Sequence, residues 1–351
     1  MKPKYKKYTI NQGDTLESVS QKLEKSTHEV KSFHNVFCDT DSYIGTSFPK
    51  NLKELFIYPE YNEKELSLIP KVPFERPYVL TLKPQQNKMN YGVMHTITLG
   101  EEVNTIKFEV SILFKGLTPN KDFIFEIDKI SKTYINDEET TNIADELAEK
   151  TSKVLYPLEI IVAKEGNWSE INNYNEITKR WEKVKEKILD EYEGKWVENY
   201  LQNNKETLED KGILERALRK DWFLASYFNA IYTFYTHKFN FETNVAFPIL
   251  TNCEAINYKV EQKINEYLEE KDVIRIEQNG VVAEERSKTD LQNESNIAYY
   301  GTLYPNEDIA EGSFRSLYFL NAKTNSIESL YLECSLTLEI EKKIQVVASL
   351  L

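Results

Sequence analysis

Apolar residues near the start of the chain change their spacing within a few positions. Residues 8–10 read as a strand, and Leu16 and Val19 then recur at the spacing of one helix face. Asp14 precedes this stripe, and Glu17 follows Asp14 three residues later. This arrangement predicts a helix that begins with Asp14 as its N-cap and Glu17 as its capping-box partner.

A second helix start follows at Ser26, again with an acid three residues later at Glu29. Val30 and Phe33 continue the apolar stripe of this helix. Residues 55–59 then read as a short strand that a proline stops. The first sixty residues therefore predict the order strand, helix, helix, strand.

Strict alternation of apolar and polar residues dominates from residue 78 to about residue 135 and returns after residue 239. Such alternation predicts antiparallel strands with one wet face. The expected strands are 91–99, 106–114, 123–130, 158–162, 245–250, 256–260, 273–276, 298–303, 317–320, 330–338 and 344–347.

The middle of the chain has helical spacing instead. Helices are expected at 140–153, at 177–192 and at 196–203. Residues 212–238 are apolar over much of a helix circumference, which predicts one buried central helix.

Strands at both ends with helices between them predict an α+β fold. It consists of a βααβ module followed by a large domain of antiparallel strands packed on a central helical layer. The expected domains are the module at 1–60, a proline-containing linker at 61–77, and the large domain at 78–351. A further boundary near residue 240 is the alternative division.

The net charge and the cysteine count of the chain limit which partners and which cellular compartment are expected. The formal net charge of −13 repels duplex nucleic acid and anionic membranes. The three cysteines are far apart and odd in number, which favours a reducing compartment over a disulfide framework. With no leader pattern and no long apolar run, the expectation is a protein that is cytoplasmic as synthesised and has no membrane insertion.

The motif residues of the first module resemble a LysM domain, the small βααβ module that binds N-acetylglucosamine glycans. The resemblance spans residues 8–59, roughly one seventh of the chain. Residues 46–54 make the second loop longer than the corresponding loop of the family. Pro49-Lys50 stands where the family has Gly-Gln. The matching residues are Tyr8, Thr9, Ile10, Gly13, Asp14, Thr15, Leu16, Val19, Asn35, Leu55, Ile57 and Pro59.

By this resemblance, sugar contacts come from the loop before the first helix and the loop after the second. Capping turns expose the N–H and C=O groups that acetamido groups need. A purely structural role as turn and cap, worth about 1 kcal/mol, stays open for the first loop. The implied glycan- or partner-binding residues are Gly13, Asp14, Thr15, Leu16, Asn35, Asp39, Tyr43 and Ile44.

Residues of catalytic or metal-binding type are scattered. His28 and His34 are six residues apart, do not share a helix face, and are expected to be solvated. Adjacent acids such as Glu284-Glu285 are expected to be surface charges, although paired acids can hydrolyse glycosides. No metal site, cofactor or catalytic residue is predicted.

The expected function is therefore that of a non-enzymatic LysM-containing binding or adaptor protein. The preferred setting is a bacterial contractile injection apparatus of the phage-tail or type VI kind, with a protein partner and delivery outward by that machine. The first alternative is a cell-wall protein that binds peptidoglycan or a chitin-like glycan. The second alternative is a wall hydrolase or toxin whose catalytic domain carries no familiar motif.

Overall fold

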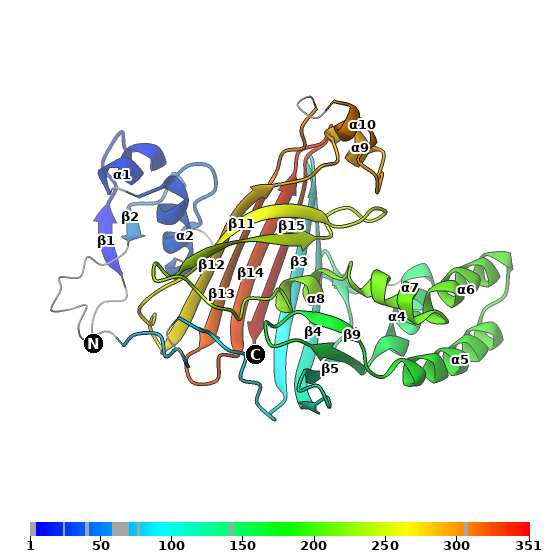
Figure 1. Cartoon of the computed structure of the whole chain (residues 1–351). Helices are drawn as coiled ribbons and strands as arrows, with labels where there is room; N and C mark the ends of the chain where they lie inside the picture. Colours follow the sequence, from blue (N-terminus) through cyan, green and yellow to red (C-terminus); the bar gives the residue numbers. More distant parts are fainter. Residues whose placement is uncertain are drawn as a thin grey trace. The chain divides into compact units, whose positions relative to one another are not determined.

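The structure, a computed structural model, describes residues 5–23, 25–38, 42–57, 70–75, 78–139, 143–304 and 308–351. The chain divides into two compact units, Met1–Pro70 and Lys71–Leu351. Figure 1 shows both units, coloured along the sequence. Mixed helices and strands with one large antiparallel sheet make the protein α+β, as predicted.

The N-terminal unit has the predicted order of elements. Strand β1 (Lys6–Thr9) pairs antiparallel with β2 (Glu54–Ile57), and α1 (Leu16–Lys22) and α2 (Thr27–Phe37) lie between them in sequence. Its core is a small apolar cluster, since a module of this size has few residues to bury. The buried members are Leu16, Val19, Val30, Ile44 and Leu55.

The second unit is built on a 13-stranded antiparallel sheet. Its main order is β10-β11-β12-β13-β14-β15-β3-β4-β5-β8-β9, and the short strands β6 and β7 lie off this path. The last strand, β15, pairs with the first strand of the unit, β3, so one sheet includes strands from both sides of residue 240. The strands are β3 (Met89–Leu99), β4 (Glu102–Leu117), β5 (Phe123–Lys129), β6 (Tyr134–Ile135), β7 (Glu138–Glu139), β8 (Leu158–Val162), β9 (Trp168–Ile171), β10 (Asn240–Phe247), β11 (Ile256–Ile264), β12 (Val273–Val282), β13 (Ser313–Asn321), β14 (Ile327–Leu336) and β15 (Lys342–Leu350).

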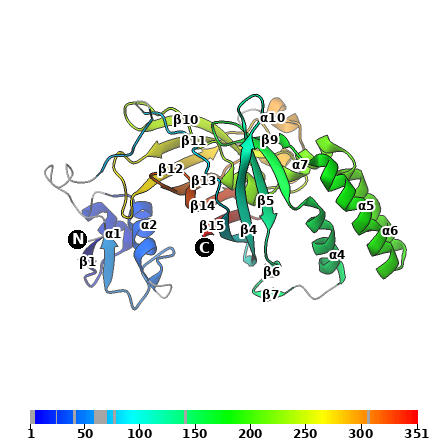
Figure 2. The same cartoon turned by 90° about the horizontal axis from the view of Figure 1, so that it is seen from below.

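Helices of this unit occupy three places. The group α4, α5, α6 and α7 lies beside the β5–β9 end of the sheet, as Figure 2 shows from below. Helix α8 lies within the curve of the sheet, and α9 and α10 lie in the connection from β12 to β13. The bounds are α4 (Ile143–Ser152), the 3-10 helix η2 (Lys153–Leu155), α5 (Tyr174–Glu191), α6 (Lys195–Leu208), α7 (Lys211–Leu218), α8 (Trp222–Tyr227), α9 (Lys288–Gln292) and α10 (Tyr299–Leu303).

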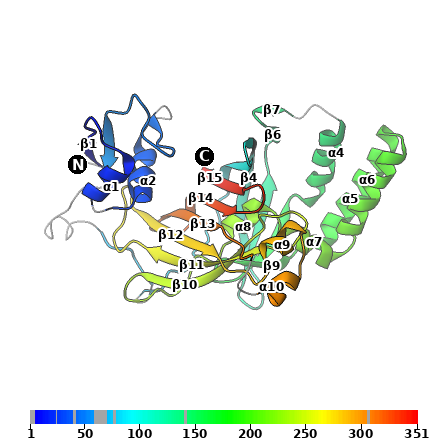
Figure 3. The same cartoon turned by 90° about the horizontal axis from the view of Figure 1, so that it is seen from above.

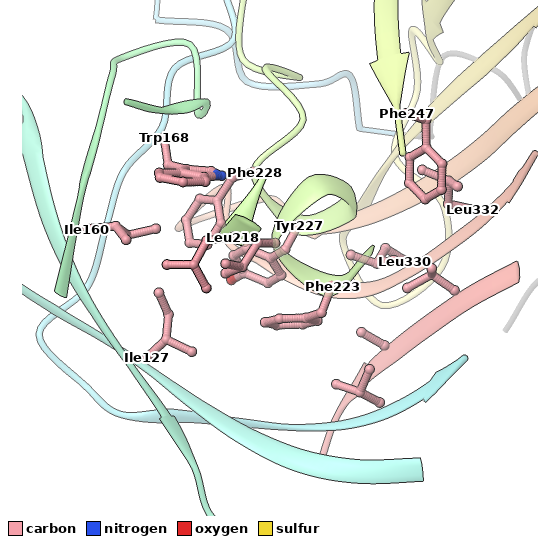
Figure 4. Close-up of a cluster of buried hydrophobic side chains, with 14 of the residues drawn as sticks. Ile127, Ile160, Trp168, Leu218, Phe223, Tyr227, Phe228, Phe247, Leu330 and Leu332 are labelled. Atoms are coloured by element: carbon pink, nitrogen blue, oxygen red, sulfur yellow. The ribbon is translucent and has the colours of Figure 1, made fainter. Parts of the chain in front are cut away.

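Helix α8 is the centre of the apolar core. Figure 4 shows Phe223, Tyr227 and Phe228 between side chains from opposite parts of the sheet, such as Ile127 on one side and Leu330 on the other. The Phe228 ring lies 5.9 Å from that of Phe125, centre to centre. A curved sheet that encloses a segment in this way makes nearly every face of that segment apolar.

Two predicted elements of the second unit are wrong. Residues 212–238 form no single helix, because Asp221 caps α8 after α7 has ended and Ala230 has a left-handed φ of 49°. The expected central helical layer is therefore only α8 and the irregular segment after it. Residues 298–303, predicted as a strand, contain helix α10.

The expected linker also ends earlier than predicted. The backbone N–H of Val72 donates to the carbonyl of Glu266 at 3.0 Å, and Val72 is buried in the second unit. Residues 61–69, 76 and 77 of the expected linker lie outside the described residues. Within the described residues, no helix combines the length and apolar character that crossing a bilayer requires.

A network of buried amides and hydroxyls fixes the irregular segment after α8 to the sheet. Gln278 donates to Gln262 at 2.7 Å, and Gln262 donates to the Ile231 carbonyl at 3.1 Å and to the Tyr235 hydroxyl at 2.6 Å. Asn229 donates to the side-chain oxygen of Gln278 at 2.9 Å. The network satisfies backbone that no regular element pairs.

We predict that Gln262→Ala lowers the free energy of unfolding of the second unit by about 2–3 kcal/mol, because it leaves the buried amide of Gln278 without its acceptor. Chemical denaturation of the full chain measures the change. Gln85→Ala, at an exposed position, is the matched control and is expected to change stability by less than about 0.5 kcal/mol. Equal stabilities of the two variants would contradict the role given to the network.

Candidate functional site

The first candidate loop, residues 11–16, is ordered by the carboxylate of Asp14. One oxygen accepts from the Asn11 backbone N–H at 2.9 Å and from the Tyr8 hydroxyl at 3.1 Å. The other accepts from the Lys22 ammonium at 2.6 Å. The hydrogen bond from Lys22, together with that from Asn11, lowers the pKa of Asp14 to about 2. Asp14 is therefore ionised at neutral pH, and its oxygens are bonded to Asn11, Tyr8 and the last residue of α1, Lys22.

Helix α1 begins one residue later than predicted. Thr15, not Asp14, is the N-cap: its hydroxyl accepts from the Ser18 N–H at 3.1 Å, and the Ser18 hydroxyl accepts from the Thr15 N–H at 2.9 Å. Ser18 thus replaces Glu17 as the capping-box partner, and the Asp14 carboxylate instead accepts from Asn11, Tyr8 and Lys22. The second capping box, Ser26 with Glu29, is confirmed.

The second candidate loop is closed by the side-chain amide of Asn35. Its oxygen accepts from the Ile44 N–H at 2.9 Å, and its nitrogen donates to the Ile44 carbonyl at 3.1 Å. Ile44 itself is buried in the core of the unit. Asn35 therefore pairs with Ile44 as a neighbouring strand would, and the pairing lets an irregular segment enter the core without losing hydrogen bonds.

His34 fixes the same loop from its other side. The Phe56 N–H donates to Nδ1 at 3.0 Å, so the neutral ring carries its proton on Nε2 and donates to the Ser42 carbonyl at 3.1 Å. The expectation of a solvated histidine is wrong for His34, which is fully buried, whereas His28 is exposed. The sequence feature that places His34 on the core face of α2 is its position four residues after the apolar residue Val30.

The eight predicted binding residues have different surroundings. Leu16 and Ile44 are core residues, and the polar side chains of Asp14, Thr15 and Asn35 are bonded within the unit. Gly13 is exposed, and Tyr43 is 50% exposed. Asp39 lies outside the described residues.

Exposed groups of the two loops include the backbone at two glycines and one aromatic ring. Gly13 has a left-handed φ of 91°, and among the described residues no atom beyond the adjacent residues lies within 4 Å of the place a Cβ would take at Gly13 or at Gly45. Gly45, which follows Tyr43 and Ile44, was not among the predicted site residues. Both loops lead into the same apolar cluster, through Leu16 and through Ile44. This arrangement suits a neutral ligand with amide and hydroxyl groups.

Within the described part of the chain, no group of three or more His, Cys, Asp or Glu side chains is placed to hold a metal ion. A groove of about 590 Å³ in the second unit lies among α4, η2, α6 and α7. Among its described lining residues, Asp221 is the one carboxylate, and it accepts from the Leu224 N–H at 2.8 Å as the α8 cap. Burial raises the pKa of Asp221.

No protein-family model and no curated protein matches this chain. Among solved structures, a structure entitled "Lipid-protein interactions in lipovitellin" is similar over 76% of this chain, with 11% sequence identity and a TM-score of 0.43. The chain spans about a quarter of that protein, since the match covers 25% of it. At this TM-score the likeness carries no functional argument.

We predict that the N-terminal unit loses stability as the pH falls below about 6.5. Burial lowers the pKa of His34 from its ordinary value of 6.5, although the bond to Ser42 opposes the shift, so the unfolded chain binds this proton first. The stability contribution is complete above pH 6.5 and declines as the pH falls toward the lowered pKa. The pH dependence of the Phe56 amide resonance of the full chain, together with denaturation curves, measures the effect.

His28→Gln is the matched control and is expected to keep this pH dependence, because His28 is exposed. His34→Gln is expected to lose it. A His34 that titrates near 6.5 without disturbing the Phe56 amide would contradict the assignment of its two hydrogen bonds.

We further predict that Asn35→Ala destabilises the N-terminal unit by roughly 1–3 kcal/mol, because two buried backbone groups of Ile44 lose their partners. Thermal unfolding followed at residues of this unit measures the loss. Asn51→Ala, at an exposed position of the same loop, is expected to have little effect. An Asn35→Ala variant as stable as Asn51→Ala would show that the two hydrogen bonds between Asn35 and Ile44 do not stabilise the unit.

Proposed function

We propose that this chain is a binding protein whose N-terminal unit is a LysM-type module. The βααβ order, the antiparallel pairing of β1 with β2 and the two capped helices support this proposal. The observation that carries it is the exposed backbone at Gly13 in the first loop and at Gly45 in the second loop, where the ring of Tyr43 is also exposed.

The ligand we propose is a glycan of N-acetylglucosamine units, as in peptidoglycan or chitin. Acetamido groups hydrogen-bond to backbone N–H and C=O groups, and an aromatic ring covers the apolar face of a sugar. Because Asp14, Thr15 and Asn35 are bonded internally, recognition falls to the backbone and to Tyr43. A contact set of this size fits weak binding by a single module.

We also propose an adaptor role, in which the second unit holds the module within a protein assembly such as a contractile injection apparatus. The support is the resemblance, since LysM-like modules occur in such assemblies, and the presence of a separate unit with its own large core. Under this proposal the glycan and the assembly partner bind different units of the chain.

Tyr43→Ala is expected to weaken binding of the full chain to purified peptidoglycan sacculi and to chitin oligomers by about tenfold, because one stacking contact is worth about 1.4 kcal/mol. Sedimentation with sacculi and titration calorimetry with the oligomers measure the change. Tyr134→Ala, which removes an exposed tyrosine of the second unit, is the matched control and is expected to bind as the unmodified chain does.

Failure of the unmodified chain to bind either glycan would overturn the glycan proposal. Equal affinity of Tyr43→Ala and the unmodified chain would place the sugar elsewhere. Neither result bears on the adaptor role, which depends on protein binding by the second unit.

A further inference from the structure

The connection from β12 to β13, residues 283–312, presents an unusual number of large apolar side chains to water. Helices α9 and α10 of this connection lie side by side at one end of the strands, as Figures 1 and 3 show. An apolar surface gathered on one short segment marks an interaction site more often than scattered residues do. We call this surface the tip patch; it consists of Ile297 (74% exposed), Tyr299 (61%), Tyr300 (42%), Leu303 (54%), Tyr304 (52%) and Ile309 (62%).

The buried carboxylate of Asp290 connects the two helices that carry the tip patch. This buried carboxylate accepts from the backbone N–H groups of Tyr300, Gly301 and Ser287, each at 2.9 Å. It therefore joins the start of α9 to the first turn of α10. A Cβ at Gly301 would lie 2.0 Å from the Glu285 carbonyl oxygen, so α10 packs directly on backbone there.

Arg286 ties the same connection to the sheet. Its guanidinium forms a buried ion pair with Glu284 and donates to the carbonyl of Ala255 at 2.9 Å. Glu284 is thus not the solvated surface acid that the sequence predicted. A segment fixed by a buried ion pair and a buried carboxylate loses little conformational entropy on binding, which is the property of a preformed recognition surface.

Within the described residues of the connection, the exposed charged side chains are acidic, and Lys342 of β15 interacts electrostatically with one of them, Glu294. Glu285, Glu294, Asp308 and Glu311 are exposed, whereas Lys288 is half-buried and Arg286 is enclosed. An acidic rim repels a second copy of the same surface and an anionic membrane. The branched aliphatic side chains Ile297, Leu303 and Ile309 offer a sugar no hydrogen bond, so they favour a protein partner.

We propose that the tip patch docks a protein partner whose contact face has an apolar pocket surrounded by lysine or arginine. The aromatic and aliphatic side chains fill the pocket, and the acidic rim pairs with the basic residues. This inference rests on the adaptor half of the proposed function and identifies its partner surface. It does not depend on glycan binding by the N-terminal unit.

A random peptide display library selected on the full chain tests the proposal. The expected peptides carry aromatic or aliphatic residues flanked by Lys or Arg, and their affinity falls as salt rises. The double variant Tyr299→Ser with Leu303→Ser is expected to bind a selected synthetic peptide at least tenfold more weakly. Tyr134→Ser with Ile143→Ser, exposed positions outside the tip patch, is the matched control and is expected to bind unchanged.

Glu285→Lys is a second variant that leaves the apolar residues in place, and it is expected to weaken the same peptide severalfold. Selection of peptides without basic residues, equal binding by the double variant, or binding of the tip patch to a second copy or to neutral phosphatidylcholine vesicles would overturn the proposal. Sedimentation with sacculi separates the two proposals, because the double variant is expected to retain whatever glycan binding the unmodified chain has.

Discussion

Backbone that crosses an apolar interior without regular structure must find hydrogen-bond partners, and side-chain amides supply them in both units. In the N-terminal unit, Asn35 pairs with both backbone groups of Ile44. In the second unit, Gln262 and its neighbour Gln278 hold the segment that follows α8, including the Ile231 carbonyl. Each amide allows a loop or an irregular segment to replace a strand at the centre of a core.

This constraint shapes what the N-terminal unit offers a ligand. The polar side chains that the LysM resemblance implies as binding residues form hydrogen bonds within the loops instead. Asp14 ends the turn, Thr15 caps the helix and Asn35 clamps the second loop. In the glycan-binding role that we propose, recognition is left to exposed backbone and to Tyr43. The second unit differs, because it exposes apolar side chains from a connection that buried charges hold in place.

The sequence predicted the strands and the βααβ order because their periods are local. Alternation with a period of two is imposed wherever an antiparallel strand has one buried face, so β3, β4 and β5 were found from their own residues. The error at residues 212–238 has a different origin. A segment enclosed by a curved sheet is apolar on all sides whether or not it is helical, and periodicity does not record the left-handed turn at Ala230. Helix α10 was missed because its N-terminal acceptor, Asp290, lies ten residues before Tyr300. The two loops lie where the sequence predicted them, between β1 and α1 and between α2 and β2, but the roles of His34 and Asn35 depend on contacts across the module that no local spacing contains.

The most direct measurement of this account is an NMR titration of the full chain with a chitin tetramer, in which backbone amides and side-chain amides are observed separately. The account predicts that the backbone resonances around Gly13 and Gly45 move with added glycan, whereas the side-chain amide of Asn35 keeps its position because it stays bonded to Ile44. Movement of the Asn35 side-chain amide, or no movement at either glycine, would contradict it.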